Sequence, residues 1–307
     1  MRIDRRAVVL GGLTAGVSGF FVSSAQSGTE LAKPATRAIP SSGERLPLVG
    51  LGSWITFNVG SDPKLLDECA AVIAAFFEGG GRLIDTSPMY GSAQATIGYG
   101  LQKLGYPTTA FSAEKVWTSS QTGGPRQIEE SLSHWGVPSH DLIQVHNLVA
   151  WKTHLEMLRE MKSAGRLRYV GITTSHGRRH AELERVMGSE PIDFVQVTYN
   201  AIDREVENRI LPLARERGIA VIINRPYQRG DLLRRVEGKP LPPWLKETGA
   251  TSWAQFLLAF VISHPAVTCA IPATTRVDHV RENLGVAARP LPDERLRMKM
   301  AAYVNEL

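Results

Sequence analysis

The amino-acid sequence predicts an α/β protein built as a (β/α)8 TIM barrel. From residue 46 onward, short runs rich in Val, Ile and Leu alternate with longer stretches of helical pattern, and this unit recurs eight times. Alternating strands and helices form parallel sheets, and eight such units favour a closed barrel over an open sheet. The 307 residues are 43% hydrophobic and 21% charged, which is typical of a folded globular protein.

The elements follow one another along the chain. Strands are expected at residues 46–54, 82–85, 110–116, 141–146, 168–172, 193–197, 220–223 and 267–271. Helices are expected at residues 63–78, 96–105, 125–135, 152–164, 176–187, 204–217, 251–263, 277–286 and 293–307. Glycines close several helical patterns, as at helix C-caps. The longer stretch between the last two strands, around residues 238–243, is expected to form a loop over the active face.

The composition of the first 25 residues differs from that of the rest of the chain and predicts a twin-arginine type signal peptide over residues 1–25. Arg5 and Arg6 precede an apolar, glycine-rich run, and Ser23-Ser24-Ala25 supplies a cleavage site of small residues. We therefore expect a linker at residues 26–44, a single barrel at 45–307, and a periplasmic or exported protein that meets the export machinery. A membrane anchor left by an uncleaved signal and a cytoplasmic location are the alternatives. A dinucleotide-binding turn at residues 7–16 is disfavoured because Leu13 interrupts the glycine pattern.

Composition excludes several other classes of protein. The formal charge is only +5 and no basic stripe with interleaved aromatic residues occurs, so nucleic acid is not an expected partner. Cys69 and Cys269 lie in apolar surroundings and are predicted to be buried thiols. His176 and His180 could share a helical face, but no third ligand is nearby in the sequence, so no metal site is expected. The oligomeric state is left open.

Four polar residues follow apolar runs and suggest a proton-delivery site. Ligands bind at the carboxyl ends of barrel strands, where Asp85, Lys115 and His146 end their runs and Tyr90 follows shortly after Asp85. Tyrosine ordinarily titrates at about pH 10, so a nearby ammonium that lowers its pKa would help it to donate a proton. Lys115 could supply that charge and Asp85 could hold Lys115 in place. His146 could orient a substrate carbonyl.

At these residues the chain resembles the aldo-keto reductases. The matching segments fall in family order across residues 45–288, and include Leu83-Ile84-Asp85-Thr86-Ser87-Pro88-Met89-Tyr90-Gly91 and Glu114-Lys115-Val116-Trp117. The resemblance implies a catalytic tetrad of Asp85, Tyr90, Lys115 and His146, with Tyr90 as general acid. It also implies that an aldehyde or ketone, a small carbonyl substrate, is reduced by hydride transfer from a nicotinamide cofactor.

The resemblance further implies where the cofactor lies. Gln196 matches the residue that holds the carboxamide, and an arginine after the last strand favours NADPH because guanidinium suits a phosphate. Thr174 and Asn224 depart from the family's asparagine and aromatic residues, and Arg225 could stack in place of the latter. The cofactor-binding residues expected on this basis are Thr173, Thr174, Gln196, Asn224, Arg225, Pro272, Thr274, Arg276, Glu282 and Asn283.

The substrate side is less strongly indicated. Trp54, Trp117 and Trp151 are candidates to line the substrate pocket, since the chain lacks the long C-terminal loop that shapes it in many relatives. Two alternative functions stay open. One is a nicotinamide-binding sensor or interaction subunit without turnover, which the departures at Thr174 and Asn224 would suit. The other is an oxidative dehydrogenase of polyols or sugars, which would use the same tetrad.

Overall fold

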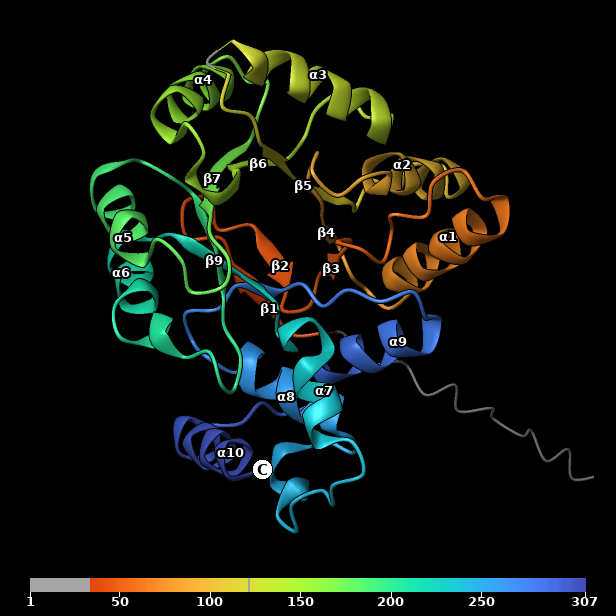
Figure 1. Ribbon diagram of the computed structural model, residues 1–307, viewed down its shortest axis with the longest axis vertical. Helices are drawn as coiled ribbons and strands as arrows, with labels where there is room; N and C mark the ends of the chain where they lie inside the picture. Colours follow the sequence, from red (N-terminus) through yellow and green to blue (C-terminus); the bar gives the residue numbers. More distant parts are fainter. Residues whose placement is uncertain (1–33, 121) are drawn as a thin grey trace, which may run out of the picture. The chain divides into compact units, whose positions relative to one another are not determined.

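The computed structural model describes residues 34–120 and 122–307, and these form a TIM barrel. Figure 1 shows the helices arranged around the strands. The parallel strands of the barrel follow chain order around the ring: β3 (Leu51–Gly52), β4 (Leu83–Asp85), β5 (Phe111–Val116), β6 (Leu142–Val145), β7 (Tyr169–Thr173), β8 (Phe194–Thr198), β9 (Ala220–Asn224) and β10 (Cys269–Ala270). The predicted fold class is therefore confirmed.

Two isolated bridges bring the first and last strands together. Val49 pairs with Ala270 and Gly52 pairs with Ala273, both in parallel orientation. Gly52 must be a glycine at this seam, because a Cβ there would lie 2.7 Å from the carbonyl oxygen of Ile271. The nearly closed ring gathers the carboxyl ends of the strands at one mouth, where ligands bind in such barrels.

The α-helices pack outside the strands. They are α1 (Pro63–Glu78), α2 (Ala93–Lys103), α3 (Gly123–Trp135), α4 (Trp151–Ser163), α5 (His180–Ser189), α6 (Ile210–Arg217), α7 (Asp231–Val236), α8 (Trp253–Ile262), α9 (Val277–Val286) and α10 (Glu294–Glu306). Asp62 caps α1 by accepting from the backbone N–H groups of Lys64 and Leu65. Gly136 and Gly218 end α3 and α6 in the left-handed conformation.

A hairpin before the barrel closes its amino-terminal end. β1 (Thr36–Ala38) pairs antiparallel with β2 (Arg45–Pro47). Ile39 and Leu46 of this hairpin pack into the cluster of side chains inside the barrel. The aromatic members of that cluster contact one another, with ring centroids 5.5 Å apart for Tyr169 and Phe194 and 5.8 Å for Phe111 and Tyr169. We call this hairpin and aromatic cluster the barrel floor.

The hairpin differs from the sequence expectations. Residues 36–38 fall in the expected linker yet form β1, and the expected strand 46–54 is divided between β2 and β3. The division has a physical cause: the chain bends at Leu48, between the floor and the wall of the barrel, and Val49 already pairs with Ala270. The expected signal peptide at residues 1–25, and the expected linker at 26–33, lie outside the described residues.

Other elements begin or end differently from their predictions. The helix expected at 176–187 begins later, at His180, because His176, Gly177 and Arg179 have positive φ angles. The helix expected at 204–217 divides into η2 (Glu205–Glu207) and α6. Residues 238–243, expected to form a loop, contain no helix or strand, and the stretch around them holds η3 (Gln228–Gly230), α7 and η4 (Leu245–Thr248).

Two further observations concern the described part of the chain. Cys69 and Cys269 are free, buried thiols, as predicted. Among the helices that the structure describes, none combines the length and the apolar character that crossing a membrane requires.

Candidate active site

The strand order brings the four predicted catalytic residues to one mouth of the barrel. Asp85 ends β4, Lys115 is the penultimate residue of β5, and His146 directly follows β6. These three strands are neighbours in the sheet. Tyr90 lies in the segment between β4 and α2, so the four side chains come from adjacent positions around the ring.

Lys115 and Asp85 form a buried ion pair. The ammonium nitrogen of Lys115 lies 2.7 Å and 2.6 Å from the two carboxylate oxygens of Asp85, and it also donates to the carbonyl oxygen of Thr86 at 2.7 Å. The exposed fractions of the two side chains are 0% and 3%. All three ammonium protons therefore have an acceptor, which a buried lysine requires.

Two glutamine amides complete the surroundings of Asp85. The amide nitrogen of Gln196, on β8, donates to Oδ1 at 2.7 Å, and that of Gln144, on β6, lies 3.3 Å from the same atom. Gln196, which is predicted to hold the cofactor's carboxamide, donates to the ion pair across the barrel. Gln144 was not among the sequence candidates, because it lies inside its strand.

Tyr90 faces both the lysine and the histidine. The ammonium of Lys115 lies 5.4 Å from the centre of the Tyr90 ring, and the rings of Tyr90 and His146 meet edge to face at 5.8 Å. Burial, followed by the negative charges of Asp85 and Glu114, raises the pKa of Tyr90 well above its ordinary value. The pKa of Tyr90 is therefore raised and not lowered as expected, because burial and the two carboxylates outweigh the effect of Lys115.

His146 is buried and uncharged. Its Nδ1 lies 2.7 Å from the hydroxyl oxygen of Ser87, which is also buried. Burial, followed by the charge of Lys115, lowers the pKa of His146 well below its ordinary value. Ser87 was not a sequence candidate for a functional role, although it lies in the segment between Asp85 and Tyr90.

Behind Lys115, the neighbouring residue Glu114 anchors β5 to two helices. Its carboxylate accepts from the side chains of Gln94, Ser131 and Trp135 at 2.9 Å, 3.0 Å and 2.8 Å. Burial raises the pKa of Glu114. This network fixes the strand that carries Lys115.

The residues expected around the nicotinamide ring lie together at the ends of β7, β8 and β9. Asn224 donates to the carbonyl oxygen of Thr174 at 3.0 Å and accepts from the hydroxyl of Thr198 at 2.6 Å. The Thr173 hydroxyl accepts from the backbone N–H of Asn147 at 3.1 Å. The Thr174 hydroxyl is buried without a hydrogen-bond partner in the described structure.

The residues expected around the adenosine lie after β10 and along α9, and most already contact protein groups. Arg276 pairs with Asp278, and Thr274 accepts from the backbone N–H of Arg276 at 3.1 Å. Glu282 accepts from Ser252, and Asn283 accepts from Tyr227 at 2.8 Å. The carbonyl oxygen of Pro272 accepts from Gly52 at 3.0 Å, so Pro272 contributes to closing the barrel.

The tryptophan candidates occupy different environments. Trp54 is covered by the guanidinium groups of Arg229 and Arg225, at 4.1 Å and 5.8 Å from its ring centre. Trp117 is 41% exposed at the end of β5. Trp151 begins α4, where its ring nitrogen donates to Glu182 of α5 at 3.0 Å. Trp54 and Trp117 therefore lie at strand ends, whereas Trp151 ties two outer helices together.

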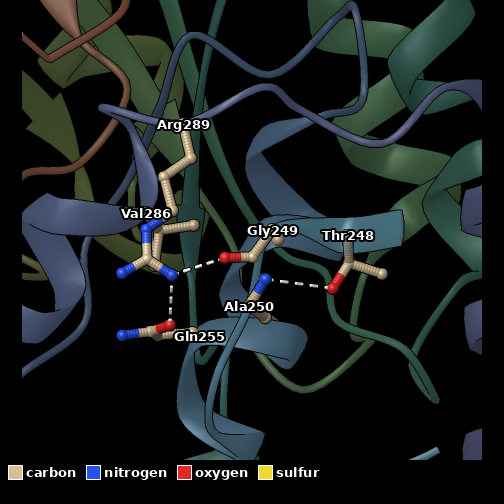
Figure 2. A pocket seen from close by; sticks show the side chains of 7 residues that line it. Thr248, Gly249, Ala250, Gln255, Val286 and Arg289 are labelled. Carbon is tan, nitrogen blue, oxygen red and sulfur yellow. Dashed lines mark hydrogen bonds between the residues drawn. The ribbon is translucent and has the colours of Figure 1, made fainter. Parts of the chain in front are cut away.

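A small pocket away from the tetrad is structural. Figure 2 shows Arg289 donating to the carbonyl oxygen of Gly249 and to the side chain of Gln255. The guanidinium lies between the turn at Thr248–Ala250 and the end of α9, so it joins these segments. Among the described residues, no group of three or more His, Cys, Asp or Glu side chains is arranged to hold a metal ion.

Comparison with known proteins agrees with this geometry. The model of the aldo/keto reductase family matches residues 48–302. Methylglyoxal reductase YeaE of Escherichia coli (strain K12) is 28% identical over 263 residues, covering 84% of this chain and 91% of that protein. An NADH-specific methylglyoxal reductase of the same bacterium is 26% identical over 220 residues, covering 60% of this chain and 65% of that protein.

A solved structure shares both fold and sequence. It is a complex of the thermostable aldo-keto reductase Tm1743 with the inhibitor epalrestat, 26% identical, with a TM-score of 0.71 and coverage of 88% of this chain and 99% of that one. The chain belongs to the aldo/keto reductase family. It is an NAD(P)H-dependent oxidoreductase of carbonyl compounds.

The buried ion pair leads to a prediction about stability. Lys115→Met leaves the Asp85 carboxylate buried without a cation, so the free energy of unfolding should fall by about 3–5 kcal/mol. Asp85→Asn should cost a comparable amount for the converse reason. In the double variant neither charge remains, so its loss should be much smaller than the sum of the two. Urea denaturation of all four proteins gives the coupling, and additive losses would show that the pair is not coupled.

Proposed function

We propose that this protein reduces an aldehyde or ketone by hydride transfer from NADPH, with Tyr90 as the general acid. The observation that carries the proposal is the convergence of Tyr90, His146 and the Lys115–Asp85 pair at the mouth of the barrel. NADPH, when bound, would supply the hydride that the carbonyl carbon receives. The protein's own task is then to bind the carbonyl oxygen, limit its negative charge and give it a proton.

The protonation states of the two rings suit this task. A raised pKa keeps the Tyr90 hydroxyl protonated at neutral pH, and a lowered pKa keeps His146 neutral. A neutral histidine can donate one hydrogen bond to the oxygen while the tyrosine delivers its proton. The phenolate left on Tyr90 would lie close to the Lys115 ammonium, which would stabilise it once the proton has moved.

The same pKa directions favour reduction over oxidation. Oxidation of an alcohol needs Tyr90 as a base, and a hydroxyl with a raised pKa is rarely ionised at neutral pH. A polyol or sugar dehydrogenase is therefore the weaker alternative. A sensor without turnover is disfavoured because its binding function would not need an ion pair buried beside a tyrosine.

The residues near the nicotinamide side fit a bound amide. The Thr174 hydroxyl is buried and has no hydrogen-bond partner in the described structure, and such a group is costly unless a ligand satisfies it. Thr174 would therefore hold the carboxamide, with Asn224 and Thr173 supporting the loop. The guanidinium groups of Arg225 and Arg229 lie over the ring of Trp54, and an arginine suits the cofactor's pyrophosphate.

The residues after β10 fit the phosphate of NADPH. Arg276 is the N-cap of α9, and its side chain makes no capping hydrogen bond within the described structure. A helix N-terminus attracts an anion, and an arginine beside it adds two donors. The family also contains an NADH-specific member, and Asp278 competes for Arg276 here, so the preference for NADPH depends on this pair.

The mouth indicates the kind of carbonyl compound. Three large apolar side chains are exposed at the ends of successive strands: Ile55 at 58%, Met89 at 38% and Trp117 at 41%. The curated relatives include methylglyoxal reductases, so a small reactive carbonyl compound is the proposed substrate. The apolar side chains favour one that carries an apolar substituent.

We also propose export through the twin-arginine route. Arg5-Arg6, the apolar run and Ser23-Ser24-Ala25 support it, and this route would let the barrel fold and bind its cofactor before translocation.

The role of Tyr90 is tested by the oxidation of NADPH with a panel of aldehydes. Tyr90→Phe keeps the ring but loses the proton, so kcat should fall by about 10²–10⁴-fold. For the wild-type protein, kcat/KM should stay level from about pH 6.5 to about pH 9, since Tyr90 stays protonated and His146 neutral throughout. Full activity in Tyr90→Phe would exclude this tyrosine as the acid. An inflection near neutrality would contradict the pKa directions.

The choice of cofactor is tested with a matched pair of variants. Arg276→Ala removes the guanidinium, so the Kd for NADPH should rise by about tenfold or more while the Kd for NADH changes little. Asp278→Ala frees Arg276 from its competitor, so it should bind NADPH more tightly than the wild-type protein does. Fluorescence titration measures both. Equal effects on the two cofactors would place the phosphate elsewhere.

Export is tested by sequencing the N-terminus of protein recovered from the periplasm of an expressing bacterium. A first residue near position 26 would agree with cleavage after Ala25. Recovery of the protein in the cytoplasm with Met1 intact would refute the proposed route.

A further inference from the structure

Ser87 and His146 form a hydrogen bond next to the proposed proton donor. The hydroxyl oxygen of Ser87 and Nδ1 of His146 are 2.7 Å apart, and the exposed fractions of the two residues are 0% and 5%. Ser87 follows Asp85 by two residues, and His146 is the first residue after β6. The contact therefore joins the ends of two strands that are not adjacent, across β5.

The partners of the serine determine where its proton lies. A serine hydroxyl has one proton to donate and can accept two hydrogen bonds. The hydroxyl oxygen of Ser87 accepts from the backbone N–H of Met89 at 3.4 Å, and within the described structure its only other partner is His146. The hydroxyl proton therefore points to Nδ1, and Nδ1 must be the unprotonated nitrogen that accepts it.

The proton of His146 consequently lies on the other nitrogen. The ring is neutral because burial and the charge of Lys115 lower its pKa, so it carries a single N–H. With Nδ1 accepting, that N–H is on Nε2. No hydrogen bond joins Nε2 to any residue that the structure describes, and the ring meets Tyr90 edge to face. The Nε2–H group is thus available to a ligand beside the tyrosine.

We propose that Ser87 is a positioning residue that holds His146 in the Nε2–H tautomer, so that the ring donates to the carbonyl oxygen to which Tyr90 delivers its proton. This inference rests on the proposed function of the tetrad. Ser87 also holds Tyr90 through its backbone, because the carbonyl oxygen of Ser87 accepts from the backbone N–H of Tyr90 at 3.0 Å. One residue therefore orients both side chains that meet the oxygen.

The tautomer can be observed without turnover. In protein labelled with ¹⁵N-histidine, two-bond ¹H–¹⁵N correlation spectra distinguish a protonated ring nitrogen from an unprotonated one, and the His146 signals are assigned by their loss in His146→Gln. The wild-type protein should show Nε2 protonated and Nδ1 unprotonated. Ser87→Ala should show a mixture or an inversion of this pattern, because Nδ1 has lost its donor.

The kinetic consequence should appear in kcat. Loss of one neutral hydrogen bond that orients the histidine should lower kcat for a reactive aldehyde by about tenfold. The Kd for NADPH should not change, since Ser87 lies on the tetrad side of the mouth. Ser87→Thr keeps the hydroxyl, so it should restore both the tautomer and most of kcat.

A second buried serine–histidine pair supplies the control. Ser131 lies 3.0 Å from Nε2 of His140, and both residues are as buried as Ser87. Ser131 also donates to Glu114, so Ser131→Ala should lower the thermal midpoint, as Ser87→Ala should, but leave the His146 tautomer unchanged, because Ser131 makes no hydrogen bond to that ring in the described structure. This separates a loss of stability from a loss of tautomer control.

Two outcomes would overturn the inference. One is an Nδ1–H pattern in the wild-type protein, and the other is a Ser87→Ala variant that keeps both the Nε2–H pattern and full kcat. Failure of the proposed function looks different. It would show as an intact Nε2–H pattern in a wild-type protein that binds NADPH but reduces no carbonyl compound in the panel.

Discussion

The ion pair between Lys115 and Asp85 is the interaction on which the mouth of the barrel depends. Two charges removed from water are stable only when they are paired and when hydrogen bonds satisfy their remaining protons and lone pairs. That requirement brings in residues from four strands: Asp85 from β4, Lys115 from β5, Gln144 from β6 and Gln196 from β8. The pair can form because β4 and β5 are adjacent and parallel, with Asp85 opposite Ala113, which places Lys115 two residues further toward the mouth. The charges of this pair act on both neighbouring rings: Asp85 raises the pKa of Tyr90, and Lys115 lowers the pKa of His146.

The same strands form an apolar floor at one end of the barrel and a polar mouth at the other. At the floor, Phe111, Tyr169 and Phe194 fill the interior with apolar volume, and the hairpin covers them. At the mouth, several of the later residues of those strands and of their neighbours are polar, and the side chains of Asp85, Lys115 and Gln196 are joined by hydrogen bonds. The division follows from chain direction, because each parallel strand begins at the floor and ends at the mouth. Stability and chemistry are therefore separated along the barrel axis, as is usual in this fold.

Much of this arrangement was predictable from sequence, and the exceptions have identifiable causes. Asp85, Lys115 and His146 could be found because each ends an apolar run, and a parallel barrel gathers such ends. Ser87 and Gln144 could not be recognised, because their roles depend on which atoms face them across the barrel. Gln196 was found, but its contact with Asp85 depends on the curvature of the ring and not on local pattern. The rise in the Tyr90 pKa was not predicted, because it is the sum of burial and several charges, and the positions of these charges are not known from the sequence. The hairpin was missed because strands of three residues are too short to show an alternating pattern.

Because of the hairpin, the first described residues lie at the floor of the barrel, opposite the mouth. Thr36–Ala38 lies at the floor, and the backbone N–H of the preceding Ala35 donates to the carbonyl oxygen of Ala287 at the end of α9. The substrate, by contrast, is expected to approach at the mouth, where the strands end. Immobilisation through the first described residues, on a bead or an electrode, would therefore orient every molecule with its mouth toward the solution.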